Sequence, residues 1–183
     1  MKTKLFALLL TAIASLGLHA QSKYMTRDGY VRFFSTTPVE DIEAVNNQMS
    51  SVFDEASFNI VFQVPIKGFQ FEKALMQEHF NENYMESNKI PNATFKGLVE
   101  GIQNIKTLNE DGTDVTLKGT LTIHGVSQDV NETFTLRMVD GKLRLAGSFE
   151  VSPKDYDIPI PSAVRDKIAE TIEVTVKAVY VQQ

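Results

Sequence analysis

The sequence predicts an all-β domain, because apolar and polar residues alternate with a period of two through most of the chain. The clearest run places apolar side chains at every second position from Phe58 to Ile66, and Val61 interrupts its polar side. Asp140-Gly141 stands between two further runs and is a strong hairpin signal. Long antiparallel strands with little helix fit either a sandwich or a closed up-and-down barrel, and the alternation alone does not distinguish them.

The alternating runs supply the candidate strands. In chain order they cover residues 30–35, 58–66, 93–99, 115–123, 134–138, 143–151 and 172–180. Gly119 and Gly147 occupy places in two of these apolar series that a large side chain could fill. Such glycines either leave room along a barrel axis or mark a bend, a bulge or a close backbone approach.

Helical segments are expected to be few and short. One covers residues 72–85 and another covers residues 161–169, where Pro161 suits a first helical turn. A third is expected over residues 39–45. In the first segment the apolar side chains group on one face of the helix, and they are Leu75, Met76, Phe80 and Tyr84.

The first twenty residues have the pattern of a secretory signal peptide. Lys2 and Lys4 form a positive start, residues 5–18 are apolar but too short to span a bilayer comfortably, and Ala20 is the expected cleavage residue. Residues 21–183 then form one domain, because no repeat, low-complexity tract or linker divides them. The chain has no cysteine, which excludes a lipid anchor on a leader cysteine. The expected location is therefore the periplasm or the medium.

The net negative charge of the chain limits the classes of partner that it is expected to bind. Without the leader, 16 basic side chains stand against 23 acidic ones, and the basic residues form no cluster. Nucleic acid and anionic membrane surfaces are therefore not expected to bind. After the leader, no apolar run is long enough to be an integral membrane segment. The sequence does not determine the oligomeric state, and a homodimer is compatible with it.

The sequence offers little for catalysis. His79 and His124 are the histidines outside the leader, and neither has a second histidine or an acidic residue at a metal-ligand spacing. No nucleophile-elbow, zinc-protease, P-loop or dinucleotide-binding motif occurs. The acidic and amide residues between Glu78 and Glu86 lack the spacing of a calcium loop, so a solvated helix end is preferred. We expect a binding protein with no catalytic residues, cofactor or metal.

Three stretches of the sequence carry a family resemblance. The longest reads FQFEKALMQEHFNENYMESNKIPNATFKG over residues 69–97, and the second reads LTIHGV over residues 121–126. The third runs from Phe149 through DYDIP at residues 155–159. In this order they resemble the YceI-like family, the lipocalin-like polyisoprenoid-binding proteins of bacteria. The resemblance extends from about residue 28 to the C-terminus, and it implies a single antiparallel up-and-down barrel of eight strands with short helices.

The resemblance also implies that an isoprenoid or other long-chain lipid lies along the barrel axis and is sequestered or transported without covalent change. Residues 75–85 are expected to close or line one end of the barrel. Because the chain is acidic, a quinone or neutral lipid suits it better than a diphosphate. The expected ligand-binding residues are Phe58, Ile60, Phe62, Leu75, Met76, Phe80, Phe95, Leu121, Ile123, Phe134, Leu136, Phe149 and Ile158.

Two other functions remain open at this stage. An eight-stranded barrel is just wide enough to be filled by its own side chains or to hold one slender ligand. The chain would be a structural or interaction protein of the cell envelope if its core were solid. The second alternative is an enzyme acting on a bound lipid, and its suggestive polar groups would be His124, Asp155, Tyr156 and Asp157.

Overall fold

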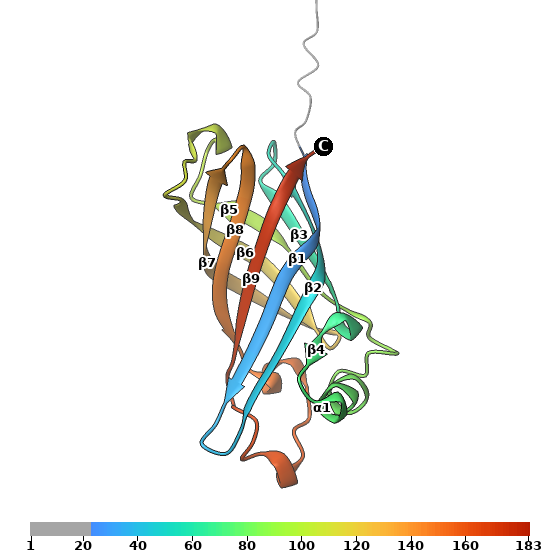
Figure 1. The fold of residues 1–183 in the computed structure, drawn as a ribbon. Coiled ribbons are helices and arrows are strands. Elements are labelled where there is room, and N and C mark those ends of the chain that lie inside the picture. Colours follow the sequence, from blue (N-terminus) through green and yellow to red (C-terminus); the bar gives the residue numbers. More distant parts are fainter. Residues whose placement is uncertain (1–22) are drawn as a thin grey trace, which may run out of the picture.

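Eight antiparallel strands close into a barrel in the computed structural model, which describes residues 23–183 (Figure 1). Each strand pairs with the next one along the chain, and the last pairs with the first, so the predicted eight-stranded up-and-down barrel is confirmed. The expected signal peptide lies outside the described residues. The barrel strands are β1 (Lys23–Thr36), β2 (Asp41–Asp54), β3 (Asn59–Pro65), β5 (Asn92–Glu100), β6 (Thr113–Ile123), β7 (Val126–Val139), β8 (Lys142–Val151) and β9 (Ile172–Gln182).

The helix expected over residues 39–45 is wrong, because this segment begins strand β2. Its side chains alternate across the sheet, with Ala44 buried inside the barrel and Glu43 exposed. The backbone of β2 is paired with β1 on one side and with β3 and the two-residue strand β4 (Gln70–Phe71) on the other. These tertiary ladders override a local helical pattern that is only seven residues long.

Two hairpins at opposite ends of the barrel turn through residues with positive φ. Asp140 and Gly141 join β7 to β8 with φ of 51° and 71°, as the sequence predicts. His124 and Gly125 join β6 to β7 with φ of 52° and 79°. Two consecutive positive φ values are the hallmark of the tight hairpin turn that matches strand twist, and they explain the Asp-Gly and His-Gly pairs.

One end of the barrel is filled by its own side chains. The loop between β5 and β6, which contains the short helix η3 (Ile105–Thr107), covers this end and buries Ile105. Below it, Tyr180 of β9 is 1% exposed, and its hydroxyl lies 2.8 Å from Oγ of Ser51 on β2. The buried apolar residues here include Phe53 and Leu143. We call this region the solid end.

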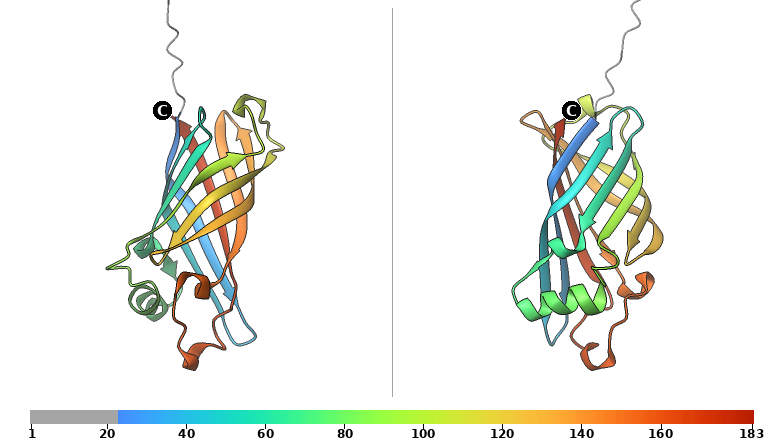
Figure 2. Two further views of the ribbon diagram at one scale, coloured as in Figure 1. Left: turned by 180° about the vertical axis from the view of Figure 1, so that it is seen from behind. Right: turned by 90° about the vertical axis from the view of Figure 1, so that its right-hand side faces the viewer.

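The other end of the barrel carries the helical segments (Figure 2). The segment after β3 forms the turn η1 (Ile66–Gly68), β4 and helix α1 (Ala74–His79), which continues as the wider π-helical turn η2 (Phe80–Tyr84). The helix expected over residues 72–85 is therefore confirmed in position. The segment after β8 forms the 3₁₀ turns η4 (Pro153–Tyr156) and η5 (Ser162–Val164). The helix expected over residues 161–169 is present only as the 3₁₀ turn η5, with a bond from Val164 N–H to the Pro161 carbonyl, and the rest of the range is not helical.

Candidate functional site

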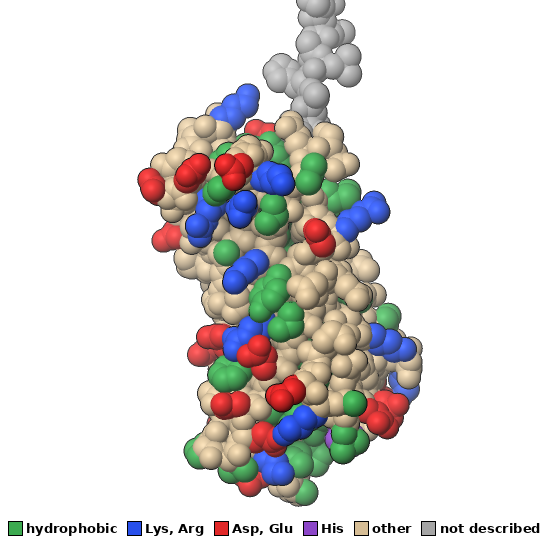
Figure 3. All heavy atoms as spheres, in the orientation of Figure 1, with side chains coloured by type: hydrophobic (Ala, Val, Ile, Leu, Met, Phe, Trp, Pro, Cys, Tyr) green, Lys and Arg blue, Asp and Glu red, His purple; other side chains and the backbone are tan. Residues whose placement is uncertain are grey.

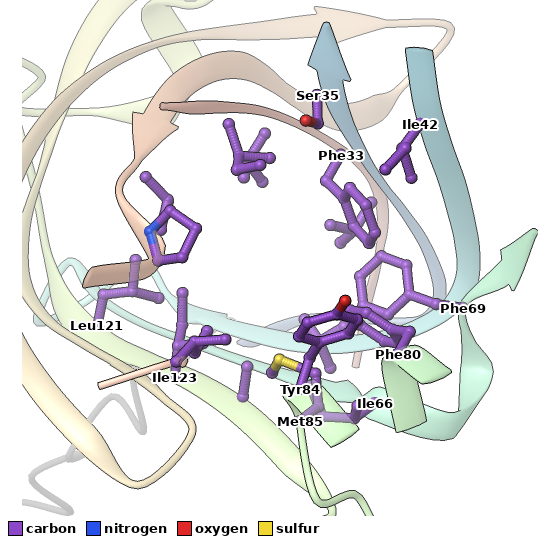
Figure 4. A pocket seen from close by; sticks show the side chains of 18 of the residues that line it. Phe33, Ser35, Ile42, Ile66, Phe69, Phe80, Tyr84, Met85, Leu121 and Ile123 are labelled. Atoms are coloured by element: carbon purple, nitrogen blue, oxygen red, sulfur yellow. The ribbon is translucent and has the colours of Figure 1, made fainter. Parts of the chain in front are cut away.

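The half of the barrel nearest the helical segments is hollow. It contains a cavity of about 460 Å³, which lies within the usual range of about 300–1,000 Å³ for small-molecule sites. Inward side chains of the eight barrel strands form its wall. Its mouth is surrounded by the turn between β1 and β2, by α1 with η2, and by residues 153–168. Figure 4 shows Phe33, Phe69 and Phe80 on one side of the open space, with Leu121 and Ile123 on another.

Most of the predicted ligand-binding residues lie on the cavity wall. Nine of the thirteen line it, and they come from five barrel strands, from α1 and η2, and from the segment after β8. These nine residues are Phe62, Met76, Phe80, Phe95, Leu121, Ile123, Phe134, Phe149 and Ile158. Alternation identified the six of them that lie on strands, because every second side chain of a strand faces the barrel axis.

The other four predicted residues lie elsewhere. Ile60 and Leu136 point inward but belong to the solid end, where they are 1% and 2% exposed. Phe58 has a φ of 57° in the turn before β3, and its ring packs 6.1 Å from that of Phe53. Leu75 is 61% exposed on the outer side of α1, so its predicted place against the barrel is wrong. Helical spacing gave the correct face for Met76 and Phe80 but not for Leu75.

An aromatic cluster forms the wall beside α1. The rings of Phe33, Phe69, Phe71 and Phe80 lie between 5.1 and 5.6 Å from one another in five pairs. Phe33 comes from β1, Phe80 from η2, and the other two from the segment between them. Aromatic pairs at these separations are tilted or edge-on, the arrangements that such rings prefer. The cluster packs the α1 and η2 segment against the barrel, and the backbone N–H of Phe71 adds a hydrogen bond to Oε1 of Gln77 at 3.2 Å.

Hydrogen bonds attach the other mouth segments to the barrel. Nε2 of Gln128 donates to the carbonyl of Asp155 at 2.8 Å, and Nδ1 of His124 lies 3.3 Å from the carbonyl oxygen of Tyr156. The backbone N–H of Ala169 donates to the buried Oγ of Ser35 at 2.9 Å. His124 therefore has a structural position, as its place in a turn suggests.

Four acidic, basic or histidine side chains lie on the cavity wall. Glu40, His79 and Lys167 come from the three segments that surround the mouth. The hydrogen bond from Nζ of Lys73, 2.8 Å away, is the main reason that the pKa of Glu40 is lowered. Glu132 instead comes from the middle of β7, and burial raises the pKa of its carboxyl.

Sequence reasoning missed several wall residues for identifiable reasons. Ile42 lies in the part of β2 that was assigned to a helix, and Met49 lies in a part of β2 for which no strand was predicted. Glu132 precedes the predicted strand at residues 134–138, whereas β7 begins at Val126. Extending the alternation backwards from Phe134 would have placed Glu132 on the inner face. Ile160 lies outside every predicted element, and Val164 and Ile168 lie in the segment expected to be a helix, for which no ligand-binding face was predicted.

The outer surface has no extended area of one charge on the face shown in Figure 3, where basic and acidic side chains are intermixed. Within residues 23–183, no group of three or more acidic or histidine side chains could hold a metal ion. No helix in the same part of the chain is long and apolar enough to cross a membrane.

Several solved structures share this fold. A polyisoprenoid binding domain from Saccharophagus degradans, implicated in plant cell wall breakdown, has a TM-score of 0.73 and 12% identity, with 87% of this chain and 98% of that chain covered. BcnA of Burkholderia cenocepacia has a TM-score of 0.69 and 13% identity, covering 84% and 96%. The YceI protein of Campylobacter jejuni has a TM-score of 0.54 and 16% identity, covering 100% and 91%. At these identities the likeness concerns the fold.

No curated protein matches the chain significantly in sequence. The sequence profile of the YceI-like domain, however, matches residues 20–180, which include all of the barrel strands except the last two residues of β9. The match covers the three stretches on which the resemblance was based, and it extends over the solid end, the hollow half and the mouth segments alike. The chain therefore belongs to the YceI-like family.

Proposed function

We propose that this protein binds a long-chain isoprenoid or similar lipid in the cavity, and that it sequesters or carries the lipid without changing it covalently. The observation that carries the proposal is the apolar cavity of about 460 Å³ inside a barrel whose opposite end is filled. The fold likeness to a protein described as a polyisoprenoid binding domain supports the choice of lipid class.

Burial against the cavity wall is energetically favourable for an apolar lipid chain. Each methylene group removed from water contributes about 0.8 kcal/mol, so a chain of a dozen carbons offsets the cost of its own ordering and immobilisation. Phenylalanine and methionine side chains such as Phe62, Phe80 and Met85 supply much of the contact surface. Methionine tolerates ligands of different shape because its thioether is flexible. Selectivity would then depend chiefly on the length and width of the cavity.

The polar groups of the enzyme alternative lie outside the cavity wall. Of the described residues lining the cavity, none is His124, Asp155, Tyr156 or Asp157. The Nδ1 atom of His124 is directed at a backbone carbonyl, where it has no nucleophile to activate. This arrangement supports binding without catalysis. The hollow half supports binding over a solid-core structural role.

Native mass spectrometry of the purified protein, followed by organic extraction, tests the proposal. We expect a mass excess that extraction removes and that has the composition of a lipid. Ala93→Phe should abolish the excess, because Ala93 lies on the cavity wall and a phenyl ring would occupy the space. Ala146→Phe is the matched control, since residue 146 lies on the outer face of β8. Protein without any adduct that also takes up no long-chain lipid in solution would contradict the proposal.

We also propose that the protein acts outside the cytoplasm, in the periplasm or the medium. The support is the leader pattern at residues 1–20 together with a net acidic chain that has no cysteine. A barrel with a filled end and a lipid-sized cavity would keep an apolar chain out of water between membranes.

A further inference from the structure

Glu132 is a carboxylic acid on an otherwise apolar strand face. On β7 the inward series reads Val130, Glu132 and Phe134, and all three line the cavity. The neighbouring residues Asn131 and Thr133 are exposed on the outer face. The carboxyl group therefore points into the barrel because of its position in the alternation, and moving it to the solvent would require a slip of the whole strand.

By its backbone position, Glu132 lies nearer the inner end of the cavity than the mouth. Phe134 is the last residue of β7 that lines the cavity, and the next inward residue, Leu136, is buried in the solid end. The register partner of Glu132 is Leu117, which is likewise the innermost wall residue of β6. The other acidic, basic or histidine residues of the wall, Glu40, His79 and Lys167, come from the segments around the mouth.

Within residues 23–183, the carboxyl group of Glu132 has no hydrogen-bond or ion-pair partner. Its surroundings raise its pKa through burial, and its charge in turn helps to raise the pKa of the Tyr156 phenol, after burial and Asp155. An acid without a partner in an apolar wall lowers the stability of the protein, and a leucine would serve the fold better. Groups of this kind are concentrated at functional sites.

We propose that Glu132 accepts a hydrogen bond from an uncharged donor, such as a hydroxyl group, on the bound lipid. The inference rests on the proposed lipid-binding function and specifies the chemistry of the ligand's polar end. A hydroxyl group supplies the missing partner for the carboxyl. A phosphate or a fatty-acid carboxylate would place a second negative charge beside the first in surroundings of low dielectric constant, where like charges repel strongly. The site thus selects neutral lipid alcohols over lipid phosphates.

Competition against a fluorescent lipid probe tests this selectivity with three ligands of equal chain length. These ligands are geranylgeraniol, its methyl ether, which lacks the donor hydrogen, and geranylgeranyl diphosphate. We expect the parent protein to bind the alcohol about tenfold more tightly than either of the others. In the Glu132→Leu variant, the preference for the alcohol over the ether should fall below about threefold. Glu132→Gln should keep most of it, because the amide oxygen still accepts a hydrogen bond.

A matched control removes an equivalent carboxyl from the outside of the barrel. Glu150→Leu changes an exposed residue of β8 and should leave the preference for the alcohol unchanged. Urea unfolding of lipid-free protein adds a second measurement, in which Glu132→Leu should be at least as stable as the parent. Lower stability of this variant would show that Glu132 is structural and would overturn the inference.

The ligand results separate this inference from the proposed function. If the parent protein bound the alcohol, the ether and the diphosphate equally well, the choice of ligand would be refuted while lipid binding stood. If the Glu132→Leu variant kept the preference for the alcohol, only the role of Glu132 would be refuted, and lipid binding would again stand. Failure of all three ligands to displace the probe, with no lipid recovered from the purified protein, would refute both.

Discussion

Gly97 on β5 and Gly119 on β6 lie directly opposite each other, and a Cβ atom built on Gly119 would come within 2.5 Å of the Gly97 Cα. The two strands therefore approach more closely here than any side chain permits. Gly147 serves a different purpose, because a Cβ atom there would collide with the ring of Phe134, which packs over it. Neither glycine leaves open space along the barrel axis, because Gly119 permits the close approach of β5 and β6 and Gly147 makes room for the Phe134 ring.

Substituting Gly119 with alanine should therefore lower the free energy of unfolding by about 1–3 kcal/mol, since the added methyl group forces the strands apart. Urea denaturation provides the measurement. Gly141→Asn is the control, because Gly141 has open space around it and asparagine tolerates its φ of 71°. That control should lose less than about 1 kcal/mol. Equal losses in both variants would argue against crowding between the strands.

Two residues on β3 should distinguish the solid end from the cavity wall. Ile60→Ala removes a side chain that is 1% exposed in the solid end, and we expect a loss of about 2–5 kcal/mol. Phe62→Ala enlarges an existing cavity, so it should cost less and should instead change the amount of lipid retained. Unfolding curves and lipid extraction give the two quantities. A larger loss for Phe62→Ala, with lipid content unaltered, would favour a solid barrel.

The segment formed by α1 and η2 is expected to control lipid exchange. Met76 and Phe80 line the cavity, and replacing both with alanine should speed exchange of a fluorescent lipid several-fold without unfolding the barrel. Leu75→Ala changes a side chain on the same helix that is 61% exposed, and it should leave the rate unchanged. Stopped-flow fluorescence follows the exchange, and circular dichroism checks the fold. Identical rates in the parent and the double variant would remove this segment from a gating role.

The hydrogen bond between Tyr180 and Ser51 should contribute to stability at the solid end. Tyr180→Phe leaves the hydroxyl of Ser51, which is 2% exposed, without its partner, and we expect a loss of about 1–3 kcal/mol. Adding Ser51→Ala should recover part of the loss, because both polar groups are then absent. Full additivity of the two substitutions would indicate that the bond contributes little.

Alkaline pH should destabilise the protein through the same tyrosine. Burial is the main cause of the raised pKa of Tyr180, so the phenol ionises in the unfolded chain before it does so in the barrel. The unfolded chain then binds fewer protons, and the free energy of unfolding falls as pH rises above about 10. Tyr180→Phe should make this fall shallower. A parallel decline in both proteins would assign it to other groups, including Tyr24 and Tyr156, whose pKa values burial also raises.

The mature protein is expected to begin at or near Gln21. Sequencing the N-terminus of protein recovered from cell fractions measures this directly. Protein from the periplasm or medium that starts close to Gln21 would agree with a cleaved leader. Intact protein that retains Met1 in the membrane fraction would contradict it, and a variant with Lys2 and Lys4 changed to glutamate should be exported poorly.

The sequence by itself determined the all-β class and the inward direction of several residues of the cavity wall. Alternation places Phe62, Leu121 and Phe149 on inner faces, because a strand directs every second side chain to the same side wherever it pairs. The Asp140-Gly141 turn could likewise be predicted from local sequence, because its backbone conformation depends on those two residues. Such features need no knowledge of distant partners.

Only the tertiary structure decided where the barrel is solid and where it is hollow. Ile60 and Phe62 belong to the same alternating run, yet one lies in the solid end and the other on the cavity wall. The strand assignment of residues 41–45 depended on ladders with β1 and β4, which a short local pattern does not reveal. The unpartnered position of Glu132 is also a property of the assembled barrel, because the residues that surround a side chain come from strands far apart in the sequence.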